Sequence, residues 1–236
     1  MVYLIDGKKI DIPTEKPYGQ GSEGLVFKKG DFAYKIYHQE MLNENYGNKE
    51  NFHKYLLNIP TKQVILPDKA IFSTTGEYVG YRAPLITGAK RKHFGITKLP
   101  KEELIKNLQI LEDDFSLLSE NYVLAADVSP VNYIYTNDTK TMNIIDPGRY
   151  RHHCLEDKDS YARQNNKQLD KLIELLLYLD FLEYKPISTK RKIQELKELI
   201  KRLKNEKNYS YRELFESITD YETIDDYAKS LKKYIR

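Results

Sequence analysis

Three short segments of the chain carry residue types that could handle phosphate groups and a metal ion. The turn at 19–24 reads Gly-Gln-Gly-Ser-Glu-Gly, and glycines let backbone amides approach phosphate oxygens closely. Lys35 lies in a run of apolar residues, where an unpaired charge is costly. Asp127, Asn132 and Asp146 supply oxygen atoms, which are the ligands that Mg²⁺ takes in proteins. Together these residue types predict a site for phosphoryl chemistry.

The glycine turn alone fits two kinds of nucleotide site, because G-x-G-x-x-G also occurs in dinucleotide-binding proteins. There the glycines lie between a strand and a helix. Here Gly24 is followed by Leu-Val-Phe, a turn, and Phe-Ala-Tyr-Lys-Ile-Tyr, a pattern that predicts strand–turn–strand. The dinucleotide interpretation is therefore disfavoured, while a plain turn in a surface hairpin stays open for the turn taken alone.

A longer pattern continues from the turn into the next two predicted strands. Val26 stands two positions after the last glycine, and Ala33 and Lys35 follow on the second strand. This resembles the G-x-G-x-x-G-x-V loop and the strand lysine of protein kinases.

A second pattern lies about a hundred residues further along. Asn132 follows Asp127 by five positions, the spacing of the catalytic loop of protein kinases. Asp146-Pro147-Gly148 closes an apolar run and resembles D-F-G with proline in place of phenylalanine. The chain thus resembles the protein-kinase-like superfamily over about residues 17–150.

This resemblance implies an α+β fold with two lobes. Residues 1–84 are expected to form a small antiparallel-sheet lobe and residues 85–236 a mainly helical lobe, with ATP and Mg²⁺ bound between them. Tyr81 to Leu85 would form the hinge whose backbone reads the adenine edge. The residues implied in nucleotide binding are Gly19, Gln20, Gly21, Ser22, Gly24, Val26, Ala33, Lys35, Ala83 and Leu85.

The resemblance also implies roles for the polar residues. Asn132 and Asp146 would hold magnesium, Asp127 would orient an acceptor hydroxyl and take its proton, and Lys35 would contact the α- and β-phosphates. Glu50, on a predicted helix at 40–57, is expected to pair with Lys35; Glu44 and Glu40 on the same segment remain alternatives.

Three departures from the family pattern bear on the substrate and on regulation. Ala125-Ala126 stands in place of His-Arg, Ser129 stands where a lysine is usual, and no A-P-E motif follows Asp146. Because a charge partner for the transferring phosphoryl group is then missing, Arg149 and Arg151 are the candidate replacements, with Arg149 assigned a catalytic role. Surface pairing of both arginines with nearby carboxylates is the alternative.

The elements that must hold these residues follow from hydrophobic periodicity. The segment 101–120 has leucines and a phenylalanine at three- and four-residue spacing, typical of an amphipathic helix, and 166–183 is a strongly apolar helix. The other predicted strands are 2–5, 10–12, 25–27, 32–37, 69–73, 78–83, 133–135 and 142–145, and the other predicted helices are 189–206 and about 223–235.

Composition indicates the cellular compartment of the protein more than its activity. The chain of 236 residues is 40% hydrophobic and 31% charged, with a net charge of +3 and one cysteine. No apolar run approaches the ~20 residues of a membrane span, no signal-peptide pattern opens the chain, and a single cysteine fits a reducing compartment. We expect a cytoplasmic protein without membrane or nucleic-acid partners.

For two further features we favour a purely structural interpretation over a functional one. His152-His153-Cys154 is read as a polar loop, because adjacent side chains point in different directions and no partner pair of ligands is visible. The basic helix at 189–206 is read as a solvated face over a core stripe, with docking of an acidic partner as the alternative.

The sequence predicts an ATP- and Mg²⁺-dependent phosphotransferase acting on a hydroxyl of a protein or small molecule. Two alternatives stay open: a weakly active or inactive pseudokinase that binds nucleotide, and transfer of AMP from a reversed ATP.

Overall fold

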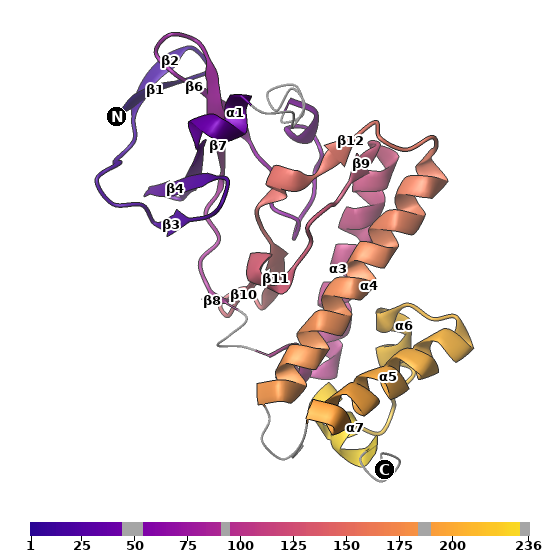
Figure 1. Ribbon diagram of the computed structural model, residues 1–236. Coiled ribbons are helices and arrows are strands. Elements are labelled where there is room, and N and C mark those ends of the chain that lie inside the picture. The colour runs from indigo at the N-terminus through magenta and orange to yellow at the C-terminus, as the bar shows by residue number, and fades with distance from the viewer. Residues whose placement is uncertain (44–53, 91–94, 184–189, 232–236) are drawn as a thin grey trace.

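The computed structural model describes residues 1–43, 54–90, 95–183 and 190–231. It is an α+β structure in which the strands come mainly from the N-terminal third and the long helices from the remainder (Figure 1). Glu44 and Glu50 lie outside the described residues.

The N-terminal strands form one antiparallel sheet of seven strands, ordered β2-β1-β6-β7-β5-β4-β3. A three-stranded sheet, β11-β10-β8, and a two-stranded sheet, β12-β9, lie beside the helices. The strands are β1 (Val2–Ile5), β2 (Lys8–Asp11), β3 (Gly19–Gln20), β4 (Gly24–Lys29), β5 (Phe32–Tyr37), β6 (Lys69–Phe72), β7 (Tyr78–Pro84), β8 (Ala89–Lys90), β9 (Val123–Leu124), β10 (Tyr133–Thr136), β11 (Thr141–Ile144) and β12 (Arg151–His152).

The hairpin β4–β5 confirms the strand–turn–strand prediction for the segment after the glycine turn. Lys29 pairs with Phe32, so Gly30 and Asp31 form a two-residue connection. Gly30 has φ +57°, a conformation that tight hairpin turns need and that glycine adopts without strain. The same hairpin fixes Lys35 opposite Val26.

The helices agree with the predicted pattern in the long segments and differ at their ends. α3 covers the predicted span, and Leu104, Leu108, Leu111, Phe115 and Leu118 are all buried. The structured elements are α1 (Gln39–Asn43), α3 (Lys101–Glu120), α4 (Lys158–Glu183), α5 (Lys190–Lys207), α6 (Tyr211–Glu216), α7 (Ile224–Leu231) and the short 3₁₀ turns η2 (Ile96–Lys98), η3 (Pro130–Asn132) and η4 (Pro147–Arg149).

One predicted helix had the wrong start, and one helix was not predicted. α4 starts at Lys158 rather than at 166, because Asp157 accepts a hydrogen bond from the Ser160 amide (2.7 Å) at the helix start. The first turns of α4 are polar and lack the apolar periodicity from which the helix start was predicted. α6 was not predicted; it begins with a capping box in which Ser210 and Glu213 bond each other's backbone amides.

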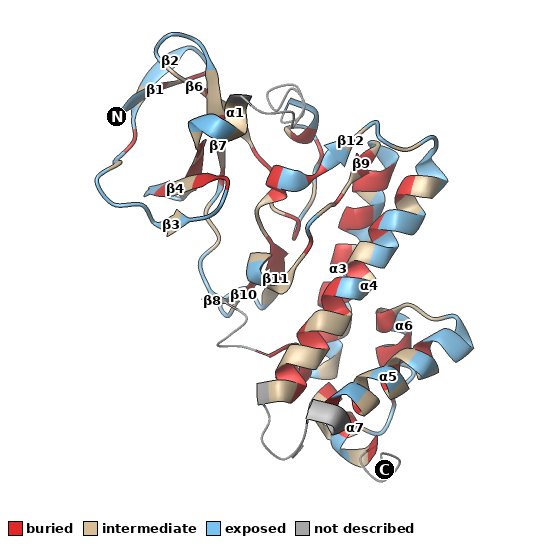
Figure 2. Ribbon diagram, in the orientation of Figure 1, coloured by how far each residue is buried: buried red, intermediate tan, exposed pale blue. Residues whose placement is uncertain are grey.

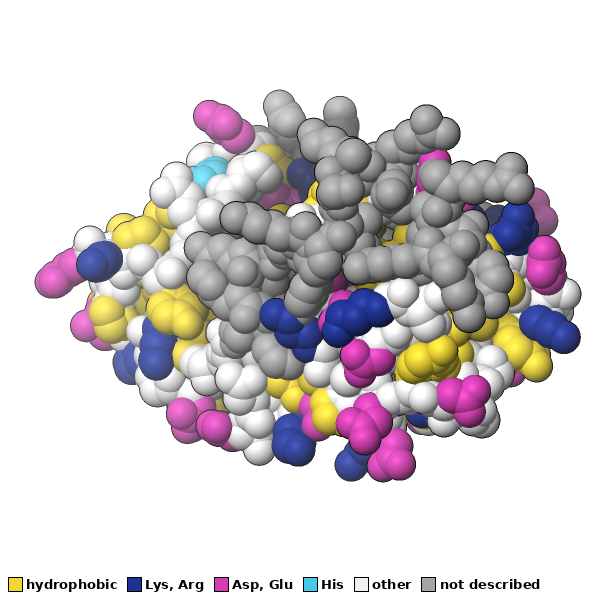
Figure 3. All heavy atoms as spheres, turned by 90° about the horizontal axis from the view of Figure 1, so that it is seen from below, with side chains coloured by type: hydrophobic (Ala, Val, Ile, Leu, Met, Phe, Trp, Pro, Cys, Tyr) yellow, Lys and Arg dark blue, Asp and Glu magenta, His cyan; other side chains and the backbone are white. Residues whose placement is uncertain are grey.

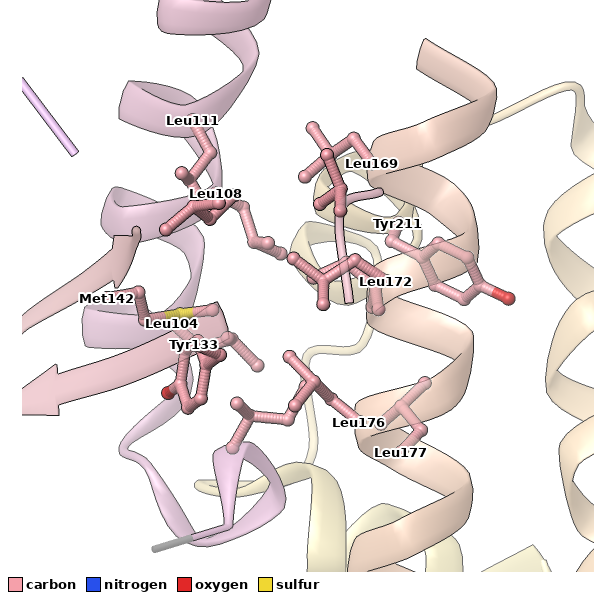
Figure 4. Packing of buried hydrophobic residues seen from close by; sticks show 14 of the residues in the cluster. Leu104, Leu108, Leu111, Tyr133, Met142, Leu169, Leu172, Leu176, Leu177 and Tyr211 are labelled. Atoms are coloured by element: carbon pink, nitrogen blue, oxygen red, sulfur yellow. The ribbon is translucent and has the colours of Figure 1, made fainter. Parts of the chain in front are cut away.

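The hydrophobic core is divided between the sheet and the helices. One small cluster, including Phe27, Tyr34 and Ile71, lies on the seven-stranded sheet. The large cluster joins α3, α4, β10 and β11, where Leu108, Leu172, Tyr133 and Met142 lie close together (Figure 4). Buried positions recur along α3 and α4 (Figure 2). The segment from Leu56 to Leu66 packs in this large cluster, although it precedes the predicted lobe boundary at 84, which stays a prediction.

Three basic side chains on α5 make contacts within the chain. Lys201 pairs with Glu174 (3.2 Å) and Lys204 with Asp170 (2.6 Å), while Lys197 lies over the Tyr178 ring. On the face seen in Figure 3, basic and acidic side chains are interspersed. The docking of an acidic partner on this helix stays a prediction. Among the helices of the described residues, none combines the length and the apolar character needed to cross a membrane.

A buried carboxylate on α3 ties the helices to the strand that leads into the predicted site. Asp114, 1% exposed, accepts hydrogen bonds from the backbone amides of Lys62, Gln63 and Val64 at 2.6–3.0 Å. Gln63 and Ile65 in turn exchange backbone hydrogen bonds of 2.8 Å with Ile144 at the end of β11. This chain of contacts fixes the position at which the chain enters the Asp146 turn.

We expect Asp114→Ala to lower the free energy of unfolding by about 3 kcal/mol, because it leaves three buried amides without their acceptor. Asp113→Ala is the matched control: Asp113 is exposed, and its loss should change stability by less than about 0.5 kcal/mol. Urea unfolding monitored by circular dichroism measures both. Equal stability of the two variants would contradict the role given to Asp114.

Candidate active site

The glycine turn, β4, β5 and the loops after β9 and β11 surround one cleft of about 400 Å³. Its walls come from segments that are far apart in the chain: the turn and the hairpin on one side, and the Asp127 and Asp146 loops on the other. The cleft is lined by Gly19, Gln20, Gly21, Ser22, Glu23, Gly24, Val26, Lys35, Asp127, Ser129, Val131, Asn132, Asp146 and Arg149.

Lys35 is the buried charge at the centre of the cleft, with 5% of its surface exposed. Its Nζ donates to Glu23 Oε2 at 2.8 Å and also to Asp146 Oδ1. The rings of Tyr37 and Tyr81 lie 5.4 and 6.0 Å from the same nitrogen, where aromatic faces attract a cation. Two carboxylates and two rings therefore compensate this buried ammonium group.

Tyr81 stabilises Asp146 from the side of the sheet. Its hydroxyl donates to Asp146 Oδ1 at 3.3 Å. Burial, with the nearby Asp146 charge as a smaller cause, raises the pKa of Tyr81 well above its usual value. The phenol is therefore protonated at neutral pH and remains a hydrogen-bond donor to the carboxylate.

The Asp127 and Asp146 loops are held side by side by backbone contacts through Asn132. The Ile145 amide donates to the Asn132 carbonyl (2.8 Å), and the Asn132 side-chain amide donates to the Asp127 carbonyl (3.3 Å). Asp127 and Asp146 both adopt the left-handed conformation, with φ of 59° and 62°. Backbone of this kind is uncommon outside glycine and concentrates at functional sites.

Arg149 points into the cleft and Arg151 does not line it. Arg149 Nε lies 3.3 Å from Glu23 Oε1 and 3.6 Å from Asp127 Oδ2. Arg151 is exposed on β12, where it pairs with Leu124 in a two-stranded ladder. Of the two candidate arginines, the structure brings only Arg149 to the other site residues that it describes.

The adenine-side residues predicted from the resemblance lie apart from the cleft wall. Ala33 and Ala83 face each other in the β5–β7 ladder, and the Leu85 amide donates to the Asp31 carbonyl (2.9 Å). None of these three belongs to the described residues that line the cleft. Among the alternatives for the lysine partner, Glu40 is exposed on α1.

Sequence reasoning missed Glu23 as one of the partners of Lys35; the predicted pairing with Glu50 lies outside the described residues. Glu23 occupies a variable position of G-x-G-x-x-G, so the pattern assigned it no role. The only sequence feature that distinguishes Glu23 is its charge, because the other residues of the turn are glycine, glutamine and serine. The contact becomes evident only when the hairpin brings Lys35 beneath the turn.

The oxygen donors fit a magnesium ion that is shared with a polyphosphate. The described residues contain no group of three or more His, Cys, Asp or Glu placed to hold a metal. Magnesium, however, is usually held by one or two carboxylates plus substrate phosphates and water. Asp146 and Asn132, held together in one wall of the cleft, match that donor set.

His152, His153 and Cys154 form part of an aromatic cluster near the surface. The His152 ring lies 4.4 Å from the ring of Tyr55, and His153 stacks on Tyr122 at 5.3 Å. Among the described residues these side chains belong to no group suited to a metal.

Comparison of the chain with models of known protein families and with curated proteins finds no match.

We expect Gly148→Ala to lower the free energy of unfolding by about 1–3 kcal/mol, because a Cβ there would lie 2.4 Å from Glu23 Oε2 and 3.0 Å from Lys35 Nζ. Gly21→Ala is the control: a Cβ at Gly21 meets nothing within 4 Å, so stability should stay within about 0.5 kcal/mol of the parent protein. Urea unfolding compares the two. A Gly148→Ala protein as stable as Gly21→Ala would show that the cleft is looser than described.

Proposed function

We propose that this protein is an ATP- and Mg²⁺-dependent phosphotransferase that moves the γ-phosphoryl group of ATP to a hydroxyl acceptor on a protein or a small molecule. One observation carries the proposal. Lys35 and Asp146, separated by 111 positions in the chain, meet directly in a cleft that Asp127, Asn132 and the glycine turn also line.

The glycine turn and Lys35 would hold the phosphates of ATP. Backbone amides of the turn can approach phosphate oxygens because Gly19, Gly21 and Gly24 carry no side chains. Asp146 and Asn132 would hold magnesium, which when bound neutralises charge on the phosphate oxygens. Ala33, Ala83 and Leu85 do not line the cleft, so they do not define where the base would bind.

Asp127 and Arg149 would act on the transferred group and the acceptor. Asp127 would orient the acceptor hydroxyl and take its proton. Arg149, whose Nε lies 3.6 Å from Asp127 Oδ2, is placed to contact phosphate oxygens near the acceptor, a task that suits a guanidinium group because of its several fixed donors. Arg149 thereby supplies the charge that Ser129 cannot.

The two-lobed kinase-like fold is part of the same proposal. The seven-stranded sheet and the helices that carry the large core would be the two lobes, and the cleft would lie between them. No family match supports this assignment, so it rests on the order of the motifs and on their convergence at one cleft.

The first test measures the products formed from ATP. We expect wild-type protein with Mg-ATP to form ADP. Asp146→Ala should slow ADP formation at least about a hundredfold, because the magnesium ion would lose its carboxylate ligand. Asp138→Ala, an exposed aspartate in the β10–β11 turn, is the control and should match the wild type. Chromatography separates the nucleotides, and circular dichroism checks folding.

The other outcomes of this test identify the alternatives. Formation of AMP with modification of an acceptor would indicate nucleotidyl transfer. Binding of Mg-ATP without product would indicate a pseudokinase. Equal ADP formation by Asp146→Ala and wild type would contradict the metal assignment.

The second test separates the two arginines. We expect Arg149→Ala to lower kcat by roughly ten- to a thousandfold, because a charge partner of the transition state is lost, with little change in nucleotide affinity. Arg151→Ala should leave kcat unchanged, since its side chain is exposed on β12. Initial rates over a range of ATP concentrations give kcat for both variants, and equal rates would remove Arg149 from the mechanism.

A further inference from the structure

Glu23 is a buried carboxylate at the candidate site to which the reaction described above gives no task. Its residue is 5% exposed, whereas Gln20, Gly21 and Ser22 beside it in the same turn are exposed. A glutamate buried at this level is rare unless it is paired. Its partners therefore indicate why it is buried.

The two oxygens of Glu23 each contact a different cation of the site. Oε2 accepts from Lys35 Nζ at 2.8 Å, and Oε1 lies 3.3 Å from Arg149 Nε. Lys35 comes from the sheet and Arg149 from η4, directly after the Asp146 loop. One carboxylate thus joins the cations of the two walls.

The backbone of Glu23 is anchored to the hairpin and not to the tip of the turn. The Glu23 carbonyl accepts from the His38 amide at 2.9 Å. Gly24 lies so close to β5 that a Cβ there would be 2.2 Å from the Ile36 carbonyl oxygen. The hairpin therefore fixes the backbone from which the carboxylate extends.

Electrostatics explains what this carboxylate contributes. Two cations directed at the same phosphate chain repel each other, and the repulsion is strong where water is excluded. A carboxylate between them offsets it. The Lys35 ammonium has three donors; within the described residues, Glu23 and Asp146 take two of them, and a phosphate oxygen would take the third.

We propose that Glu23 is a positioning residue for phosphoryl transfer: it holds Lys35 and Arg149 at one distance and in one orientation, so that both cations meet the same phosphate chain. This inference rests on the function proposed above. It predicts that the Glu23 charge matters more for turnover than for nucleotide binding, because the paired cations are needed most where phosphoryl charge develops.

The test compares Glu23→Gln, Glu23→Asp and the control Glu77→Gln, an exposed glutamate before β7. ATP turnover gives kcat and KM, and calorimetry with Mg-ADP gives Kd. We expect Glu23→Gln to lower kcat about ten- to a hundredfold with KM and Kd within about threefold of wild type. Glu23→Asp, which keeps the charge, should recover part of kcat, and Glu77→Gln should match wild type.

Three results would overturn the role of Glu23. The first is a Glu23→Gln kcat equal to that of wild type. The second is tighter Mg-ADP binding with a higher kcat, which would make Glu23 a competitor of phosphate. The third is a fall in Mg-ADP affinity that accounts for the whole loss of activity. If Glu23→Gln does not fold by circular dichroism, Glu23→Met, which also removes the charge, carries the test, and an unchanged kcat in that variant overturns the proposal.

The two proposals fail in different ways. A wild-type protein that forms no ADP refutes the phosphotransferase activity, and the role of Glu23 falls with it. An active wild type with an equally active Glu23→Gln refutes the role of Glu23 alone.

Discussion

The ammonium group of Lys35 is the charge around which the cleft is arranged. It is buried within a sheet, where an isolated charge is costly. Glu23, Asp146 and two aromatic rings surround it and offset that cost. These partners come from the glycine turn, from the loop after β11 and from the sheet itself. The compensation of one charge therefore requires three separate segments to meet.

The meeting of these three segments depends on a second buried carboxylate, that of Asp114, which lies further from the cleft. Asp114 bonds three consecutive amides of the segment at 62–64, and this segment pairs with the end of β11. A second directional contact links α3 to β11 itself, because Asn107 Oδ1 accepts a hydrogen bond from the Met142 amide (2.7 Å). Apolar contacts are non-directional, so these polar contacts fix the register of the strand that leads to Asp146.

The sequence predicted most of the long elements because hydrophobic periodicity is local, and it named most of the cleft lining because the order of the motifs resembles that of protein kinases. Hydrophobic periodicity defined α3, and glycine spacing with Val26 and Lys35 defined the hairpin; Asp127, Asn132, Asp146 and Arg149 line one cleft with the turn. Short strands such as β8 and β12 have two residues each and no periodicity to read. The start of α4 depends on the Asp157 cap in a polar stretch. Glu23 was missed because its importance arises only from the contacts that the folded turn makes with Lys35 and Arg149.

The charges that line the cleft bear on how a nucleotide could enter it. Among the described residues of the lining, Glu23, Asp127 and Asp146 oppose Lys35 and Arg149, which leaves one negative charge in excess. A polyphosphate alone would enter against this excess, and its oxygens would compete with Glu23 for the cations. A divalent cation reverses the balance, because it places positive charge beside Asp146 while the phosphates approach Lys35. In the proposed function, ATP would therefore enter together with Mg²⁺, the ion that Asp146 and Asn132 would hold.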